Sequence, residues 1–149
     1  MSVVISEYFA EQTLVVETQA ASGVAGPLHG AKIGMFTNPI TLTEKTLLTE
    51  LTQNIDANLV PASVTWGTAY RRQEGGIAID ASLTEFQLAS SANAGSFYGY
   101  FIVDSGGTHL LLSESFANPL SLSDTLDGIS IAAQFAMGGP DFGSAAVLA

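Results

Sequence analysis

Beyond residue 60, apolar residues recur in several runs at every second position, which is the spacing of β-strands rather than of helices. We expect strands at residues 60–66, 77–80, 83–89 and 129–136. In the third of these, Phe86 and Leu88 alternate with Glu85 and Gln87. One face of that strand is therefore expected to be buried and the other to meet water.

The clearest hairpin is predicted over residues 97–116. Gly106 and Gly107 can form its two-residue turn, because glycine reaches the positive φ angles that such a turn requires. The face that begins with Val103 opposite Leu110 is almost wholly apolar and continues through three further pairs: Phe101 with Leu112, Gly99 with Glu114 and Phe97 with Phe116. A shift by one residue would mix the two faces, so the pattern favours this register and places its phenylalanines in the core.

The first half of the body has a different pattern. Residues 32–37 form an apolar run of strand length, which the turn signal Asn38-Pro39 ends. Thr41 and Glu44 then fit a capping box at the start of a helix. Four apolar residues follow at helical spacing: Leu47, Leu48, Leu51 and Ile55. This pattern predicts one helix over residues 42–54, packed as a lid on a sheet.

Residues 1–30 carry three glutamates and no base, with one plausible strand at residues 13–17 and a Gly- and Ala-rich stretch at residues 20–30 that favours a loop. We expect an extended N-terminal arm and linker here, followed by a single body at residues 31–149. The arm has little surface of its own to pack on, so its apolar residues are the candidate interface with a partner: Val3, Val4, Ile5, Tyr8, Phe9, Leu14 and Val16. The alternative is a first strand packed in the main sheet.

Many short strands joined by Gly, Asn-Pro and Asp-Gly turns are typical of a β-sandwich. We expect an all-β sandwich of jelly-roll type with one short helix and the N-terminal arm. Its last strand should turn one apolar side inward: Ile129, Ile131, Ala133 and Phe135. The tail after Gly138 has a single charge and is expected to pack against another surface.

Composition narrows the possible partners. The chain has 149 residues, of which 14 are acidic and four basic, so its net charge is -10. Nucleic acid and anionic membranes are disfavoured, because both require clustered Lys and Arg. The absence of Cys excludes disulfides and thiolate metal sites. No basic residue precedes Lys32, so no signal peptide is expected.

Charged residues make up only 12% of the chain, and its mean hydropathy is +0.34. Such sparse charge is typical of a surface that partner subunits cover. We therefore expect a homo-oligomer, with a trimer as the favoured state. A small and well-filled core is the alternative explanation.

One motif resembles a catalytic segment. Residues 104–107 (Asp-Ser-Gly-Gly) resemble the nucleophile segment of chymotrypsin-like proteases, and the chain order His29, Asp56, Ser105 suits that family. The hairpin turn explains the same four residues, however, and His29 lies in a Gly-rich linker. We therefore interpret these residues as structural.

The other candidate sites are weaker. Glu85 and Glu114 could act as a glycosidase pair, but one lies on the wet face of a strand and neither has an aromatic platform beside it. Asp124 and Asp127 lack the spaced ligands of an EF-hand loop, so we expect a turn there. Trp66 could stack on a sugar, although a lone Trp among strand residues is more often core. We expect no catalytic residue, no metal and no cofactor.

Four segments carry a family resemblance: residues 35–38 (Met-Phe-Thr-Asn), Trp66-Gly67, residues 98–104 (Tyr-Gly-Tyr-Phe-Ile-Val-Asp) and the Leu-Leu-x-Glu-x-Phe strand at residues 111–116. Over roughly residues 32–137 the chain resembles small structural proteins of tailed bacteriophages, of the capsid cement or decoration type. That resemblance implies a jelly-roll-like body, frequent trimers and no catalytic residues.

The expected function is that of a non-enzymatic virion protein, made in the host cytoplasm, that binds the major capsid protein on the capsid exterior and stabilises the head. Two alternatives remain. A host- or glycan-binding module of a tail or head fibre would expose a cluster of aromatic residues: Trp66, Tyr70, Tyr98 and Tyr100. A small hydrolase would instead have a cleft with convergent carboxylates.

Overall fold

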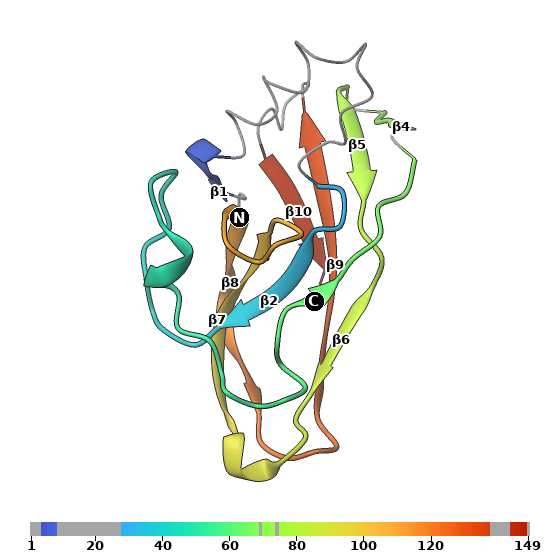
Figure 1. The fold of residues 1–149 in the computed structure, drawn as a ribbon. Helices are drawn as coiled ribbons and strands as arrows, with labels where there is room; N and C mark the ends of the chain where they lie inside the picture. The colour runs from blue at the N-terminus through green and yellow to red at the C-terminus, as the bar shows by residue number, and fades with distance from the viewer. Residues whose placement is uncertain (1–3, 9–27, 69, 74, 138–143, 149) are drawn as a thin grey trace.

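The computed structural model describes residues 4–8, 28–68, 70–73, 75–137 and 144–148, which form two antiparallel β-sheets packed against each other (Figure 1). The prediction of an all-β sandwich is confirmed, whereas its jelly-roll type stays a prediction. The only helical elements with defined bounds are two 3-10 turns, η2 (Leu48–Glu50) and η3 (Ser91–Asn93), within the described residues.

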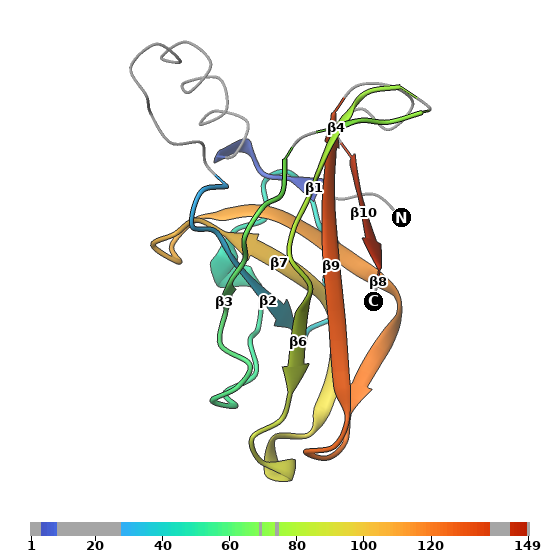
Figure 2. The same cartoon turned by 90° about the vertical axis from the view of Figure 1, so that its right-hand side faces the viewer.

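The first sheet has the strand order β1-β8-β7-β2-β3 (Figure 2). Its strands are β1 (Val4–Ile5), β8 (Leu110–Leu122), β7 (Gly95–Val103), β2 (Lys32–Phe36) and β3 (Ala62–Ser63). β7 and β8 form the long hairpin that the sequence predicts, and β2 is the predicted strand that opens the body. The expected strand at residues 60–66 is reduced to β3 and an isolated bridge between Trp66 and Ala81.

The second sheet has the order β10-β9-β5-β4, and β6 also pairs with β9. Its strands are β4 (Tyr70–Arg71), β5 (Ile77–Asp80), β6 (Thr84–Gln87), β9 (Gly128–Met137) and β10 (Ser144–Leu148). The strands predicted at residues 77–80, 83–89 and 129–136 are thus confirmed as β5, β6 and β9. The tail segment at residues 144–148 pairs with β9 of its own chain.

The main core lies between the two sheets. The first sheet contributes buried side chains that include Ile33, Met35, Phe97, Tyr100 and Ile102. The second contributes Phe86, Ile129, Ile131, Ala133 and Phe135, so the predicted inward faces of β6 and β9 are confirmed. Each large apolar side chain buried here stabilises the fold by about 1.5–3 kcal/mol.

The hairpin departs from its predicted register at two places, the first of which is an extra residue in β8. Val103 lies opposite Leu110, as predicted, but the next pair is Ile102 with Leu112, and Leu111 has no partner in β7. This β-bulge shifts the pairs from Ile102 to Gly99 by one residue, so that Phe101 faces Ser113 rather than Leu112. A second irregularity follows Gly99, and Phe97 faces Leu120 rather than Phe116. The predicted pairs beyond the first are therefore wrong.

The turn of the hairpin is also longer than predicted. Gly107 has a φ of 71° and Gly106 has no positive φ, so the two do not form a two-residue primed turn. Instead the Gly107 N–H donates to the Asp104 carbonyl (2.9 Å), and the Asp104 N–H donates to the His109 carbonyl (3.0 Å). The loop therefore spans residues 104–109. It is longer than a two-residue turn, and its side chains hydrogen-bond to one another.

The outer face of the first sheet carries a second and smaller core, which consists of Phe36, Leu51, Phe101, Val103 and Leu110. Here each of two phenylalanine rings lies over a glycine of the neighbouring strand. Gly34 is opposite Phe101 and Gly99 is opposite Phe36 in the β2–β7 pairing. A Cβ on Gly34 would lie 2.6 Å from the Phe101 ring, and one on Gly99 would collide with the Phe36 ring and the Glu114 carbonyl oxygen. Aromatic rings that cover glycines in this way give a sheet its close packing.

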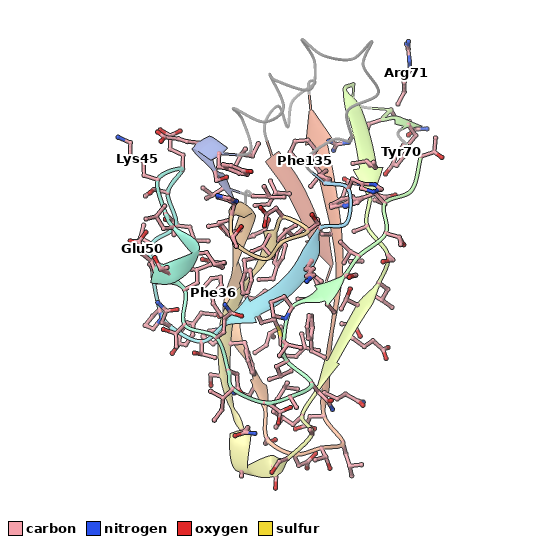
Figure 3. The ribbon with its side chains drawn as sticks, viewed as in Figure 1. Phe36, Lys45, Glu50, Tyr70, Arg71 and Phe135 are labelled. Atoms are coloured by element: carbon pink, nitrogen blue, oxygen red, sulfur yellow. The ribbon has the colours of Figure 1, made fainter. Side chains whose placement is uncertain are left out.

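The predicted lid helix over residues 42–54 is wrong. The segment does cover the outer face, with Phe36 directed toward it (Figure 3), but it is irregular apart from η2. Several of its backbone groups bond to side chains: the Asn38 side chain accepts from the Thr52 N–H (2.8 Å) and donates to the Glu50 carbonyl (3.0 Å). The Glu50 carboxylate accepts from the Leu47 N–H (2.6 Å). Such bonds compete with helix formation, and Thr residues add little helix propensity.

Candidate interaction sites

The N-terminal segment lies along the edge of β8. Its strand β1 pairs with Leu112 and Ser113 of β8. Beyond β1, the Ser6 N–H donates to the Leu111 carbonyl (2.9 Å) and the Ser6 hydroxyl donates to the Leu110 carbonyl (2.5 Å). These bonds pair backbone groups on both sides of the bulge, at a sheet edge where they would otherwise lie open to another chain.

Tyr8 extends this contact to the turn of the hairpin. Its ring stacks on the His109 imidazole, with centroids 4.0 Å apart and planes at 7°. His109 Nδ1 lies 2.7 Å from Oδ2 of Asp104, whose Oδ1 accepts from the Thr108 N–H (2.8 Å). Burial alone would raise the pKa of Asp104, but the hydrogen bonds from His109 and Thr108 outweigh it and lower that pKa. One carboxylate thus organises the turn, and Tyr8 covers it.

Three of the seven candidate interface residues lie in the described part of the chain: Val4, Ile5 and Tyr8. All three are half-buried, and Ile5 and Tyr8 pack on the main core. The expectation that the arm finds little surface within its own chain is therefore wrong for residues 4–8. Val3, Phe9, Leu14 and Val16 lie outside the described residues, as does the expected strand at residues 13–17. Contact of this region with a partner stays a prediction.

Asp56 joins two loops through its hydrogen bonds. Its buried carboxylate accepts hydrogen bonds from the backbone N–H groups of Asn58 (2.9 Å), Ala89 (2.9 Å) and Ser90 (3.1 Å). The Asn93 side-chain amide donates a fourth bond (3.0 Å). These bonds, first that from Ala89, lower the pKa of Asp56 to about 2. The carboxylate therefore holds the loop at residues 56–58 against residues 89–93. Among the described residues it has no histidine partner, so it does not form the triad that the protease resemblance would need.

Glu114 places a carboxyl group between the two sheets, beside the main core. It lies opposite Tyr100 and is only 2% exposed, and its Oε2 and the Tyr100 hydroxyl have no hydrogen-bond partner among the described residues. Burial raises the pKa of Glu114 to about 7. Glu85 is exposed on β6 of the other sheet, so the structure does not bring the two glutamates together as a glycosidase pair.

The remaining candidates also have structural partners. Asp124 and Asp127 hold the β8–β9 turn, where the Asp124 carboxylate accepts from the Leu126 N–H (2.8 Å) and Asp127 from the Ser123 hydroxyl (2.5 Å). Within the described ranges, no group of three or more His, Asp and Glu side chains could hold a metal ion. The prediction of a turn at Asp124 and Asp127 is therefore confirmed.

The four aromatic residues of the glycan hypothesis do not form one exposed cluster. Tyr100 is fully buried between the sheets, and Tyr98 packs on the outer core. Trp66 is half-buried against the main core. Tyr70 is exposed on β4, where its hydroxyl accepts from the Gln134 amide (2.7 Å) and donates to Asp80 (3.2 Å). The chain by itself thus offers no aromatic platform from these four residues.

A groove that the sequence did not reveal opens on the outer face of the first sheet. This outer groove has a volume of about 400 Å³ and is lined mainly by Lys32, Leu48, Gln53, Val60, Phe101 and Val103. Phe101 and Val103 form its floor, η2 forms one wall and the chain before β3 forms the other. One sequence pattern indicates a covered outer face: the apolar run from Phe97 to Val103 is uninterrupted, and a strand that is buried on both faces shows no alternation.

No helix in the described residues is both long enough and apolar enough to cross a membrane. No family model, no curated protein and no solved structure matches the chain.

Proposed function

We propose that this protein is a non-enzymatic structural component of a tailed bacteriophage virion. In this role it binds the major capsid protein on the exterior of the head as a cement or decoration protein, and it associates with itself as a trimer. The sandwich would then be of the jelly-roll type seen in the family that the sequence resembles.

One observation carries the proposal: an exposed apolar end of the sandwich. The β8–β9 turn and η3 lie at the same end of the molecule (Figures 1 and 2). Leu126, in that turn, is 87% exposed, and Ile55, which lines a hollow together with residues 93–96 after η3, is 90% exposed. Large apolar side chains that are almost fully exposed at one end of a molecule are typical of a protein contact site.

The proposal is tested on virions. Mass spectrometry of purified heads should detect the protein, and mild heat or a chelator should release it. The purified protein should bind the stripped heads again and raise the temperature at which they break open. Absence of the protein from virions, or its recovery with tails alone, would contradict the proposed place on the head.

Two variants locate the contact. Ile55→Ser and Leu126→Ser should each weaken binding to stripped heads, because both side chains are exposed and lose apolar contact area. Thr125→Ser, in the same turn as Leu126, is the matched control and should bind as the wild type does. Equal binding by all three variants would exclude this end as the attachment surface.

A further inference from the structure

The outer groove combines an apolar floor with one cation. Lys32 is half-buried at its rim, in β2 and directly opposite Val103 of β7. Phe101 and Val103 below it are fully buried, and the Phe101 ring lies against Gly34. The apolar surface that a ligand would contact therefore lies on the walls of the groove, at Leu48 and Val60, above these two buried side chains.

Lys32 has no carboxylate partner among the described residues, although the chain carries 14 acidic residues and only four bases. The Glu50 carboxylate at the end of η2 accepts from the Leu47 N–H, and the Asp104 carboxylate in the hairpin turn is bonded to His109 and Thr108. Gln53, on the wall of the groove, adds an uncharged amide. The groove therefore offers its single positive charge to an acidic group from outside.

Apolar surface continues past the groove. Val60, on one wall, is 59% exposed, and Leu47, which precedes η2 on the other, is 63% exposed. A ligand that matches both features is longer than the groove itself and alternates apolar contacts with one negative charge. An extended polypeptide has this chemistry, because its side chains project at regular intervals along the chain.

We propose that the outer groove binds an extended segment of a partner polypeptide in which one Asp or Glu lies between apolar residues, with its carboxylate paired to Lys32. This surface is separate from the exposed apolar end that is proposed to meet the capsid. The inference does not depend on that function.

Three blocked peptides test the proposal: acetyl-Leu-Val-Glu-Val-Leu-amide and its counterparts with Gln or Lys in the central position. Titration into ¹⁵N-labelled protein should shift the amide signals of Lys32, Gln53 and Val103 most strongly. We expect the Glu peptide to bind about fivefold more tightly than the Gln peptide, the ratio for one partly exposed ion pair, and the Lys peptide to bind most weakly. Added salt should reduce the difference.

Lys32→Met keeps the apolar stem of the side chain and removes its charge. This variant should bind the Glu and Gln peptides equally, with the Gln peptide unaffected. Lys45→Met removes a charge that projects into solvent (Figure 3) and should preserve the wild-type preference.

Three results would overturn the proposal: equal affinity of the wild type for all three peptides, signal shifts confined to another surface, or unchanged discrimination in Lys32→Met. Binding of octanoate at the groove without binding of the Glu peptide would also overturn it, because the occupant would then be a small fatty acid.

Discussion

The first sheet is buried on both faces, but the two faces are covered differently. Its inner face packs against a second regular sheet, with side chains interleaved from β6 and β9. Its outer face packs against the irregular segment that follows β2, where two phenylalanine rings fill the space over two glycines. The difference shows that an irregular but hydrogen-bonded segment can cover a hydrophobic core when the side chains of the sheet below it already fill the space.

The two faces also differ in what they bury. The inner core contains the unpartnered Glu114 carboxyl beside the Tyr100 hydroxyl, whereas the outer core in the described residues is formed by apolar side chains and glycine backbone. Stability should therefore respond to pH through the inner face.

The largest effect is expected from removal of a phenylalanine on either face. Phe97→Ala in the inner core should cost about 5 kcal/mol and Phe101→Ala in the outer core about 3 kcal/mol. The loss of stability is smaller for Phe101→Ala because the irregular segment that borders the outer groove can move to fill part of the cavity. Urea unfolding of the two variants measures both values. Equal losses, or a larger loss for Phe101→Ala, would show that the coil is as rigid as the second sheet.

The second effect concerns Glu114. Its pKa in the folded protein is about 7 against an ordinary 4.5, so between these values the unfolded chain loses a proton that the folded chain keeps. Stability should therefore fall as pH rises through this window, by on the order of 3 kcal/mol, and should level off above pH 7.

Glu114→Gln should remove this dependence, since its side chain stays neutral. Denaturant unfolding between pH 4.5 and 8 tests it, with Glu85→Gln on the exposed face of β6 as the control that keeps the wild-type profile. A variant profile as steep as that of the wild type would mean that another group controls the inner face.

The third effect compares the two glycines under the rings. Gly99→Ala should cost about 3 kcal/mol, the upper end for overpacking, because the new methyl group meets a backbone carbonyl as well as the Phe36 ring. Gly34→Ala should cost about 1 kcal/mol, because it meets only the end of the Phe101 ring, which can tilt. Thermal unfolding of both variants decides the order. The reverse order would place the rigid contact at Phe101.

The smallest effect is expected at the sheet edge. Tyr8→Ala removes the ring that stacks on His109 and should destabilise the protein by about 1 kcal/mol. Hydrogen exchange should report faster opening of residues 104–109 with little change in the β2–β7 pairing. Faster exchange across both faces of the sheet would instead show that the N-terminal segment supports the whole sandwich.

Alternation along the chain predicted the strands that have one wet face, such as β6, because the exposed Glu85 and Gln87 reveal the pattern. The same reasoning failed where both faces are buried. In β7, apolar residues at successive positions fit either register, so the extra residue Leu111 could not be recognised from alternation.

The lid helix failed for a related reason. Helical spacing of Leu47, Leu48, Leu51 and Ile55 is present in the sequence. In the structure Leu51 is buried while Ile55 is almost fully exposed. The decisive contacts, such as those of Asn38 with Glu50 and Thr52, join residues whose pairing depends on the end of β2.

For the candidate interface, the sequence identified apolar residues but could not show that Ile5 and Tyr8 pack on their own sheet.

The N-terminal strand has a consequence for synthesis on the ribosome. Val4 can pair only after Ser113 has left the exit tunnel, and β2 likewise waits for β7. The β7–β8 hairpin closes locally, so it can serve as the template on which the earlier strands assemble backwards along the chain. Until Val4 and Ile5 pair with it, the edge of β8 remains open to a neighbouring nascent chain, and that pairing ends the risk of misassembly at this edge.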